Sequence, residues 1–177
     1  MRATRAIVHL DSFLKNFKLI QERIGPQRRI CVPVKADAYG HGALEIARLS
    51  LAAGAFCLGV ADVQEGAALR NAGISAPILL FSQPLPAEIP ELLKNFLSPL
   101  VSDGEFIEML AKTAAEAKIR LPVHLKIDTG MGRMGCAPAE APILAEQIAA
   151  SSLEYAGTAT HLAVLDSPAP EDLTYTE

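Results

Sequence analysis

A lysine that directly follows a short apolar run is the first residue in this sequence that could do chemistry. Lys35 follows residues 30–34 and precedes Tyr39, Gly40 and Gly42. Desolvation by apolar neighbours lowers the pKa of a lysine toward the neutral amine, which is the form that makes a Schiff base. A lysine whose stem lies along a strand end, with its ammonium group in water, fits the spacing equally well. Gly40 and Gly42 allow a tight turn or a close approach to a ligand, and Tyr39 supplies a hydroxyl group.

A second group of polar residues lies along and after a predicted strand at residues 122–127. His124, Lys126 and Asp128 alternate, so their side chains share one face of the strand. Three ionisable groups on one face are costly to bury unless they are paired or used. This face therefore points into a barrel or cleft, or it is a solvated face of an edge strand. Arg133 follows in the next loop, and its guanidinium suits a carboxylate or phosphate.

The same loop contains a literal G-x-G-x-x-G pattern, formed by Gly130, Gly132 and Gly135. In a dinucleotide-binding fingerprint the last glycine lies inside an opening helix. Here Pro138 delays the helix, and Arg133 would crowd the approach of a pyrophosphate. We therefore expect a loop with another role.

His161 follows a further predicted strand at residues 153–161. A lone histidine at a strand end is more often a structural hydrogen-bonding group than a catalyst. Its position favours function, because several candidates fall at the carboxyl ends of predicted parallel strands or just beyond them: Lys35, Lys126, Arg133 and His161. Parallel α/β folds bind ligands at that edge, so we expect a single pocket to collect these side chains.

Short apolar runs alternate with amphipathic segments along the chain, which predicts an α/β fold. Six strands are expected at 29–34, 57–60, 77–81, 97–101, 122–127 and 153–161, after a strand-like run at 6–10. Helices are expected at 12–24, 43–53, 63–72, 87–95, 103–117 and 139–151. N-caps are expected at Asp11, Asp62 and Asp103, and first-turn acids at Glu88, Glu91 and Glu105. The pattern fits an open doubly wound sheet or a parallel barrel. A closed barrel of eight units typically needs about 250 residues, so six units would leave one incomplete.

Composition excludes several classes of protein. The chain has 177 residues, half of them apolar, and a net charge of −4, which provides no electrostatic footprint for nucleic acid. No apolar stretch is long enough to span a membrane and no secretory signal is visible, so a cytoplasmic location is expected. Three widely spaced cysteines, Cys31, Cys57 and Cys136, predict neither a disulfide framework nor a metal site.

At these motifs the sequence resembles the alanine racemase family. The resemblance runs over essentially the whole chain, and it is carried by residues 6–11, 34–42, 124–135 and 160–161. It implies a TIM-type barrel of parallel (β/α) units followed by a C-terminal β domain, so residues 1–177 would hold the N-terminal portion, about six of the eight units. It also implies a cytoplasmic homodimer that uses pyridoxal 5'-phosphate to interconvert L- and D-alanine, an isomerase reaction that feeds peptidoglycan precursors.

The resemblance also implies roles for individual residues. Lys35 would form the Schiff base with the cofactor and act as the base on the D-alanine side of the α-carbon. Tyr39 would contact the cofactor phosphate, and His161 would lie beside the pyridine ring. Lys126, often carbamylated in the family, would help to orient Arg133 beside the substrate carboxylate. Asp128 belongs to the same motif as a supporting residue, and no metal is implied.

The family's second base is a tyrosine of the C-terminal domain that reaches in from the other subunit, and this sequence has no counterpart of it. We therefore expect racemase activity to require a complementary C-terminal polypeptide or domain. The alternatives are a non-catalytic barrel that binds pyridoxal phosphate for cofactor homeostasis, and an inactive truncated fragment. Arg133 argues against a pure carrier, which has no evident need for a group that binds a substrate carboxylate.

Overall fold

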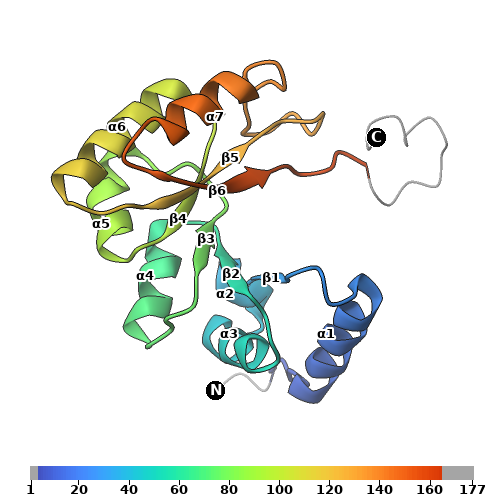
Figure 1. The fold of residues 1–177 in the computed structure, drawn as a ribbon. Coiled ribbons are helices and arrows are strands. Elements are labelled where there is room, and N and C mark those ends of the chain that lie inside the picture. The colour runs from blue at the N-terminus through green and yellow to red at the C-terminus, as the bar shows by residue number, and fades with distance from the viewer. Residues whose placement is uncertain (1–3, 165–177) are drawn as a thin grey trace. The chain divides into compact units, whose positions relative to one another are not determined.

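The computed structural model describes residues 4–164, and the contacts divide the chain into two compact units, Met1–Leu79 and Leu80–Glu177. Strands and helices alternate along both units, as the colours in Figure 1 show.

The first unit is built on a parallel pair of strands. β1 (Cys31–Pro33) pairs with β2 (Cys57–Val60) so that Cys31 lies opposite Cys57. The Leu58 N–H donates to the carbonyl of Pro77, just before β3 (Ile78–Leu80), which spans the boundary between the units. Parallel neighbours need a crossover, and the segment between β1 and β2 supplies it.

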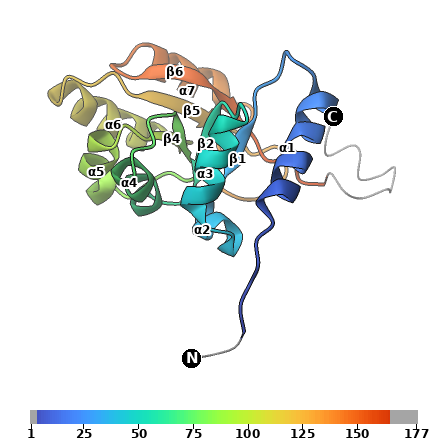
Figure 2. The ribbon, with the colours of Figure 1, turned by 90° about the horizontal axis from the view of Figure 1, so that it is seen from below.

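Four helices surround this pair: α1 (Leu10–Ile24), α2 (Lys35–Gly40), α3 (Ala43–Ala52) and α4 (Val63–Asn71). α3 contacts both α1 and α2, and α4 contacts β2; Figure 2 shows α2 at one end of α3. The apolar strand residues are almost fully buried, including Val32, Val34, Leu58 and Val60. Burial of this apolar surface is the main contribution that stabilises the unit.

The second unit carries three parallel strands. β4 (Ser98–Val101) pairs with β5 (Pro122–Lys126), and β5 pairs with β6 (Glu154–Ala159), with an irregularity in register between Val123 and His124. The helical segments are η1 (Pro86–Glu88), α5 (Ile89–Lys94), α6 (Gly104–Glu116) and α7 (Ala141–Ala149). α6 contacts α5 and α7, and α7 contacts β5 and β6, which places these helices against the sheet (Figure 1).

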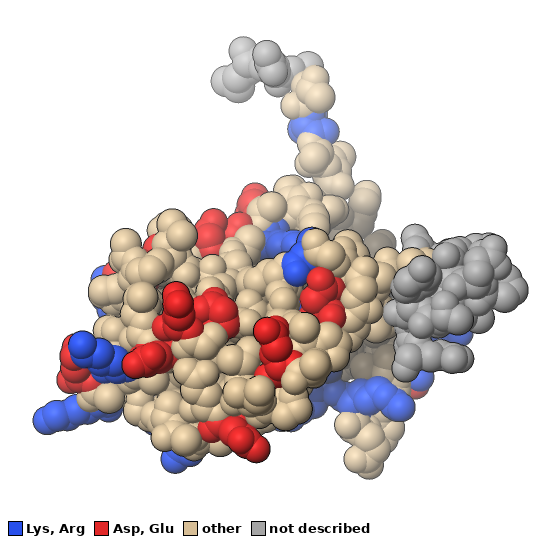
Figure 3. Space-filling view, turned by 90° about the horizontal axis from the view of Figure 1, so that it is seen from above, with Lys and Arg blue, Asp and Glu red and all other residues tan. Residues whose placement is uncertain are grey.

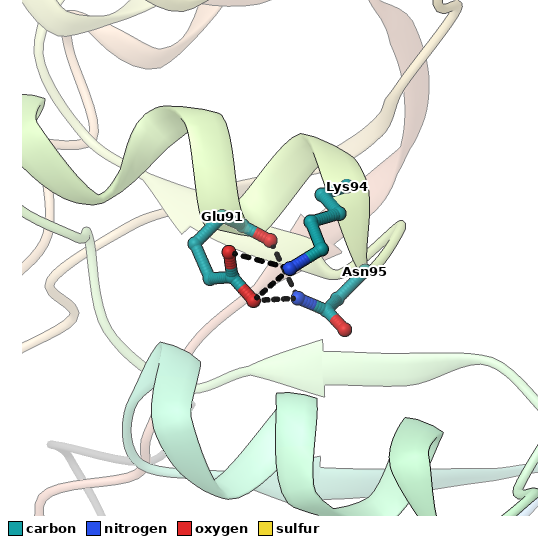
Figure 4. A network of polar contacts seen from close by, with 3 residues as sticks. All are labelled: Glu91, Lys94 and Asn95. Carbon is teal, nitrogen blue, oxygen red and sulfur yellow. Dashed lines mark hydrogen bonds and ion pairs between the residues drawn. The ribbon is translucent and has the colours of Figure 1, made fainter.

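The end of α5 is held by a small network of polar contacts (Figure 4). Lys94 Nζ lies 3.2 Å from both carboxylate oxygens of Glu91. The amide nitrogen of Asn95 donates to the Glu91 carbonyl and to its carboxylate, both at 2.8 Å. The hydrogen bonds from Asn95 and then Lys94 lower the pKa of Glu91. Glu91 lies in the first turn of α5, as expected, and its carboxylate also binds the side chains of Lys94 and Asn95.

Two of the three expected N-caps are confirmed. The Asp62 carboxylate accepts from the Glu65 N–H, and the Asp103 carboxylate accepts from the Phe106 N–H. The expectation for Asp11 is wrong, because α1 starts at Leu10 with His9 as its N-cap and Asp11 in the first turn. The strand expected at residues 6–10 is wrong too, since residues 4–9 form no regular element. A strand needs a hydrogen-bonded neighbour, and no described strand pairs with this segment.

Within residues 4–164 no helix has the length and apolar character needed to cross a membrane. Asp and Glu side chains spread over the face shown in Figure 3 and are mixed with Lys and Arg.

Candidate active site

Lys35 begins an unusual turn at the carboxyl end of β1. The four residues after it, Ala36, Asp37, Ala38 and Tyr39, have φ angles of 49°, 53°, 52° and 57°. They form a left-handed helical turn, which costs roughly 1–2 kcal/mol per L-residue. The neighbouring structure must therefore hold this segment in place.

Glu65, near the start of α4, contributes much of the stabilisation of this turn. Its carboxylate accepts a hydrogen bond of 2.6 Å from the Ala36 N–H and one of 2.8 Å from the Ala61 N–H. The carboxylate thus ties the first residue of the turn to the end of β2. The Asp37 carboxylate also contributes, because it accepts from the Ala43 N–H at 2.7 Å.

Sequence reasoning missed the role of Glu65, although one signal was available. Asp62 and Glu65 have the spacing of a capping box, in which the acid three residues after the N-cap bonds backward to the backbone. Here Glu65 bonds to Ala61 and, in addition, to Ala36 on the neighbouring crossover. The second contact depends on the fold and carries no local sequence signal.

The Lys35 amine is half-buried and lies 5.9 Å from the centre of the Tyr39 ring. Among residues 4–164, no ion pair holds it. Tyr39 is 60% exposed, and it lines a cavity of about 460 Å³ together with Pro33, Ala38 and His41. A neutral lysine amine reacts with carbonyl compounds, and no described carboxylate pairs with the amine of Lys35.

The second unit places Lys126 at the end of β5. Only 8% of Lys126 is exposed, and its Nζ donates to the Ile127 carbonyl at 3.1 Å. Burial lowers the pKa of Lys126, the negative charge of Asp128 partly opposes that effect, and the positive charge of Arg133 adds to it. Lys126 therefore has a larger neutral fraction than a solvated lysine.

Asp128 organises the loop that follows β5. Its Oδ1 accepts from the N–H groups of Gly130 and Gly132, both at 3.1 Å. These backbone hydrogen bonds hold the pKa of Asp128 below its usual range. Two more bonds of 2.9 Å close the loop, from the Asp128 N–H to the Cys136 carbonyl and from the Cys136 N–H to the Lys126 carbonyl. Asp128 thus shapes the segment that carries Arg133, which is itself exposed.

Gly135 is required by the same loop. A Cβ atom at this position would lie 2.5 Å from the Asp128 nitrogen and 2.8 Å from the Ile127 carbonyl carbon, both backbone atoms. Helix α7 starts only at Ala141, so the three glycines do not open a helix. The expectation that they are not a dinucleotide fingerprint agrees with this geometry.

His124 and His161 differ in their surroundings. His124 is half-buried and its Nδ1 lies 3.1 Å from the Ser98 hydroxyl, which donates to the Pro122 carbonyl at 2.7 Å. Burial lowers the pKa of His124, and these contacts give it a structural role. His161 is exposed and lies two residues beyond the end of β6. The structure therefore places Lys126, Asp128, Arg133 and His161 at or after the carboxyl ends of β5 and β6.

Parallel strands that alternate with helices define an α/β protein, and each unit carries a lysine at or just after the carboxyl end of a strand, Lys35 after β1 and Lys126 in β5. The sequence profile described as "Alanine racemase, N-terminal domain" matches residues 8–177, and the chain belongs to this family.

Relatives of known sequence agree with that assignment. The alanine racemase of Treponema denticola is 51% identical over 178 residues, which is 100% of this chain and 47% of that protein. The alanine racemase of Treponema pallidum is 42% identical, over 100% of this chain and 48% of that protein. The chain thus spans about half the length of these relatives.

Solved structures confirm the fold class. An alanine racemase from Clostridium difficile superposes with a TM-score of 0.85 and 31% identity, over 94% of this chain and 43% of the other. That of E. faecalis has a TM-score of 0.86 and 30% identity, over 94% and 46%. A histidine racemase from Leuconostoc mesenteroides has a TM-score of 0.82 and 27% identity, over 94% and 45%. The six strands thus belong to the TIM-type barrel of this family.

Proposed function

We propose that this chain forms the N-terminal barrel portion of a pyridoxal-phosphate-dependent racemase that interconverts L- and D-alanine. The observation that carries the proposal is the position of Lys35, whose amine pairs with no described carboxylate and which begins a turn that Glu65 constrains. The relatives named alanine racemase support it across the full length of the chain.

The residues at the strand ends fit the cofactor. A primary amine such as Lys35 is the group that binds an aldehyde, and the exposed phenol of Tyr39 can donate to a phosphate oxygen. His161 would lie beside the pyridine ring, as the family resemblance implies. When bound, pyridoxal phosphate supplies an electron sink that stabilises negative charge at the substrate α-carbon.

Each of the chain's own groups then has a defined task. The Lys35 amine takes the α-proton on the D-alanine side or returns it there. The Arg133 guanidinium binds the substrate carboxylate through its fork of N–H donors. Asp128 fixes the loop that presents Arg133, through its bonds to Gly130 and Gly132.

Lys126 is the proposed site of a carbamate. Burial favours its neutral amine, and this amine can attack CO₂ to form a new N–C bond while one proton leaves to solvent. The product carries a negative charge beside Arg133 and orients its guanidinium.

The second catalytic base, in this proposal, is a residue outside this chain. Racemisation needs bases on both faces of the α-carbon, and this chain supplies the candidate for one of them. We therefore include a C-terminal polypeptide or domain, a homodimer and a cytoplasmic location in the proposal, all on the strength of the family resemblance.

Borohydride trapping tests the cofactor assignment in the protein that contains this chain. Reduction fixes the cofactor to its lysine, and a modified Lys35 blocks tryptic cleavage, so the label appears on peptide 30–48. The Lys35→Ala variant loses the label, whereas Lys118→Ala at an exposed position keeps it. A label on another lysine in the unmodified protein contradicts the assignment.

Exchange of the α-proton with deuterated water tests the reaction. Alanine is expected to exchange its α-proton and change configuration, and serine and histidine serve as competing substrates. Trapping at Lys35 without any exchange on an amino acid would support a cofactor carrier instead. A stronger reaction with histidine would replace alanine as the substrate.

A further inference from the structure

Two cysteines on neighbouring strands lie directly opposite each other. Cys31 is the first residue of β1, Cys57 is the first residue of β2, and the two are register partners in the parallel ladder. Side chains of register partners project from the same face of a sheet, and adjacent strands lie about 4.7–4.9 Å apart. A disulfide joins Cα atoms separated by roughly 4.4–6.8 Å, so the backbone of this pair already has a suitable spacing.

The two thiols also influence each other's ionisation. Hydrogen bonding to Cys31 lowers the pKa of Cys57; burial opposes that effect, and the positive charge of Arg29 adds to it. The same contact, together with burial, raises the pKa of Cys31. The two thiols therefore share an environment that favours the thiolate on one of them.

Access to the pair is uneven. Cys57 is 4% exposed, whereas Cys31 is half-buried. Cys136, in the second unit, is a buried single thiol whose pKa is raised by burial. The chain thus contains one paired and one unpaired thiol environment.

We propose that Cys31 and Cys57 are a dithiol site that a peroxide converts to a reversible disulfide. The thiolate of one cysteine attacks one peroxide oxygen, the O–O bond breaks, and with one proton the products are a sulfenic acid and water. The thiol of the other cysteine then attacks that sulfur, the S–O bond breaks, and a second water leaves with the proton of that thiol. The two thiols lose two electrons, and the peroxide gains them. The disulfide would join the first residues of β1 and β2, and Cys31 lies four residues before Lys35.

Mass spectrometry of the native protein tests this site independently of any cofactor. The protein is treated with hydrogen peroxide, alkylated, and digested with trypsin without reductant. Peptides 30–35 and 49–70 are expected as one linked species, lighter by two hydrogen atoms than their sum and separated by dithiothreitol.

Matched variants give the control. Cys31→Ser and Cys57→Ser each abolish the linked species, whereas Cys136→Ser leaves it unchanged. Linkage of either cysteine to Cys136 would overturn the proposal. Full alkylation of both thiols after peroxide, or sulfinic acid on one of them without a link, would overturn it as well.

Discussion

Glu65→Gln should weaken the turn that presents Lys35, because a glutamine cannot replace both hydrogen bonds of the carboxylate. The amide oxygen can accept one N–H, while the NH₂ group faces the other donor, from Ala36 or Ala61. Four left-handed residues cost roughly 4–8 kcal/mol at about 1–2 kcal/mol each. Two hydrogen bonds to a charged group contribute roughly 3–6 kcal/mol together, so the loss of one removes about 2 kcal/mol. The turn would then be less stable by about this amount.

The rate of borohydride-trappable labelling at Lys35 is the assay, with a urea unfolding curve measured beside it. Gln64→Ala is the matched control, because Gln64 is the exposed neighbour of Glu65 on the same helix. We expect Glu65→Gln to slow labelling and lower the unfolding midpoint, and Gln64→Ala to leave both unchanged. Equal labelling rates and equal midpoints in the two variants would refute the role assigned to Glu65.

Three further predictions concern the last residue of β5 and the loop after it. Gly135→Ala should destabilise the protein by about 2–4 kcal/mol, because the new Cβ overpacks the loop and weakens the two backbone hydrogen bonds of Cys136. Gly132→Ala is the control: its Cβ meets nothing within 4 Å, so only the unfavourable backbone conformation should cost about 1–2 kcal/mol. Similar unfolding midpoints of the two variants would contradict the steric argument. Because the pKa of Asp128 is lowered in the folded protein, its stabilising effect is present above the unfolded-state pKa of about 3.9 and is lost as pH falls through the folded-state pKa. Asp128→Asn should therefore reduce the pH dependence of the free energy of unfolding in that acid range. An unchanged pH dependence would contradict the role assigned to Asp128. Alanine exchange should depend on added bicarbonate in the unmodified protein and not in the Lys126→Arg variant. Equal responses of the two proteins would contradict a carbamate at Lys126.

Local patterns predicted most of the elements. Each of the six expected strands contains an observed strand, and the caps at Asp62 and Asp103 are present. Apolar runs and caps are local signals, so the sequence carries them directly. The strand expected at residues 6–10 fails because a strand also needs a neighbour.

The candidate residues were predicted better than their tasks. Asp128 was expected as one of three polar groups on a shared face, and the structure shows it bonded to the backbone of its own loop. The left-handed turn after Lys35 could not be predicted, because its conformation depends on Glu65 from another helix. The pairing of Cys31 with Cys57 likewise follows from strand register, which the separation along the chain does not reveal.

The bond from Glu65 to the turn sets the smallest piece of this protein that can be moved to another scaffold. A peptide of residues 34–42 contains the lysine and the glycines but lacks the carboxylate that compensates for four unfavourable backbone conformations. Such a graft would relax to right-handed or extended geometry, and the amine would point elsewhere. A graft that keeps the turn needs at least the segment from Cys31 to Asn71, because it contains both strands and the helix that carries Glu65.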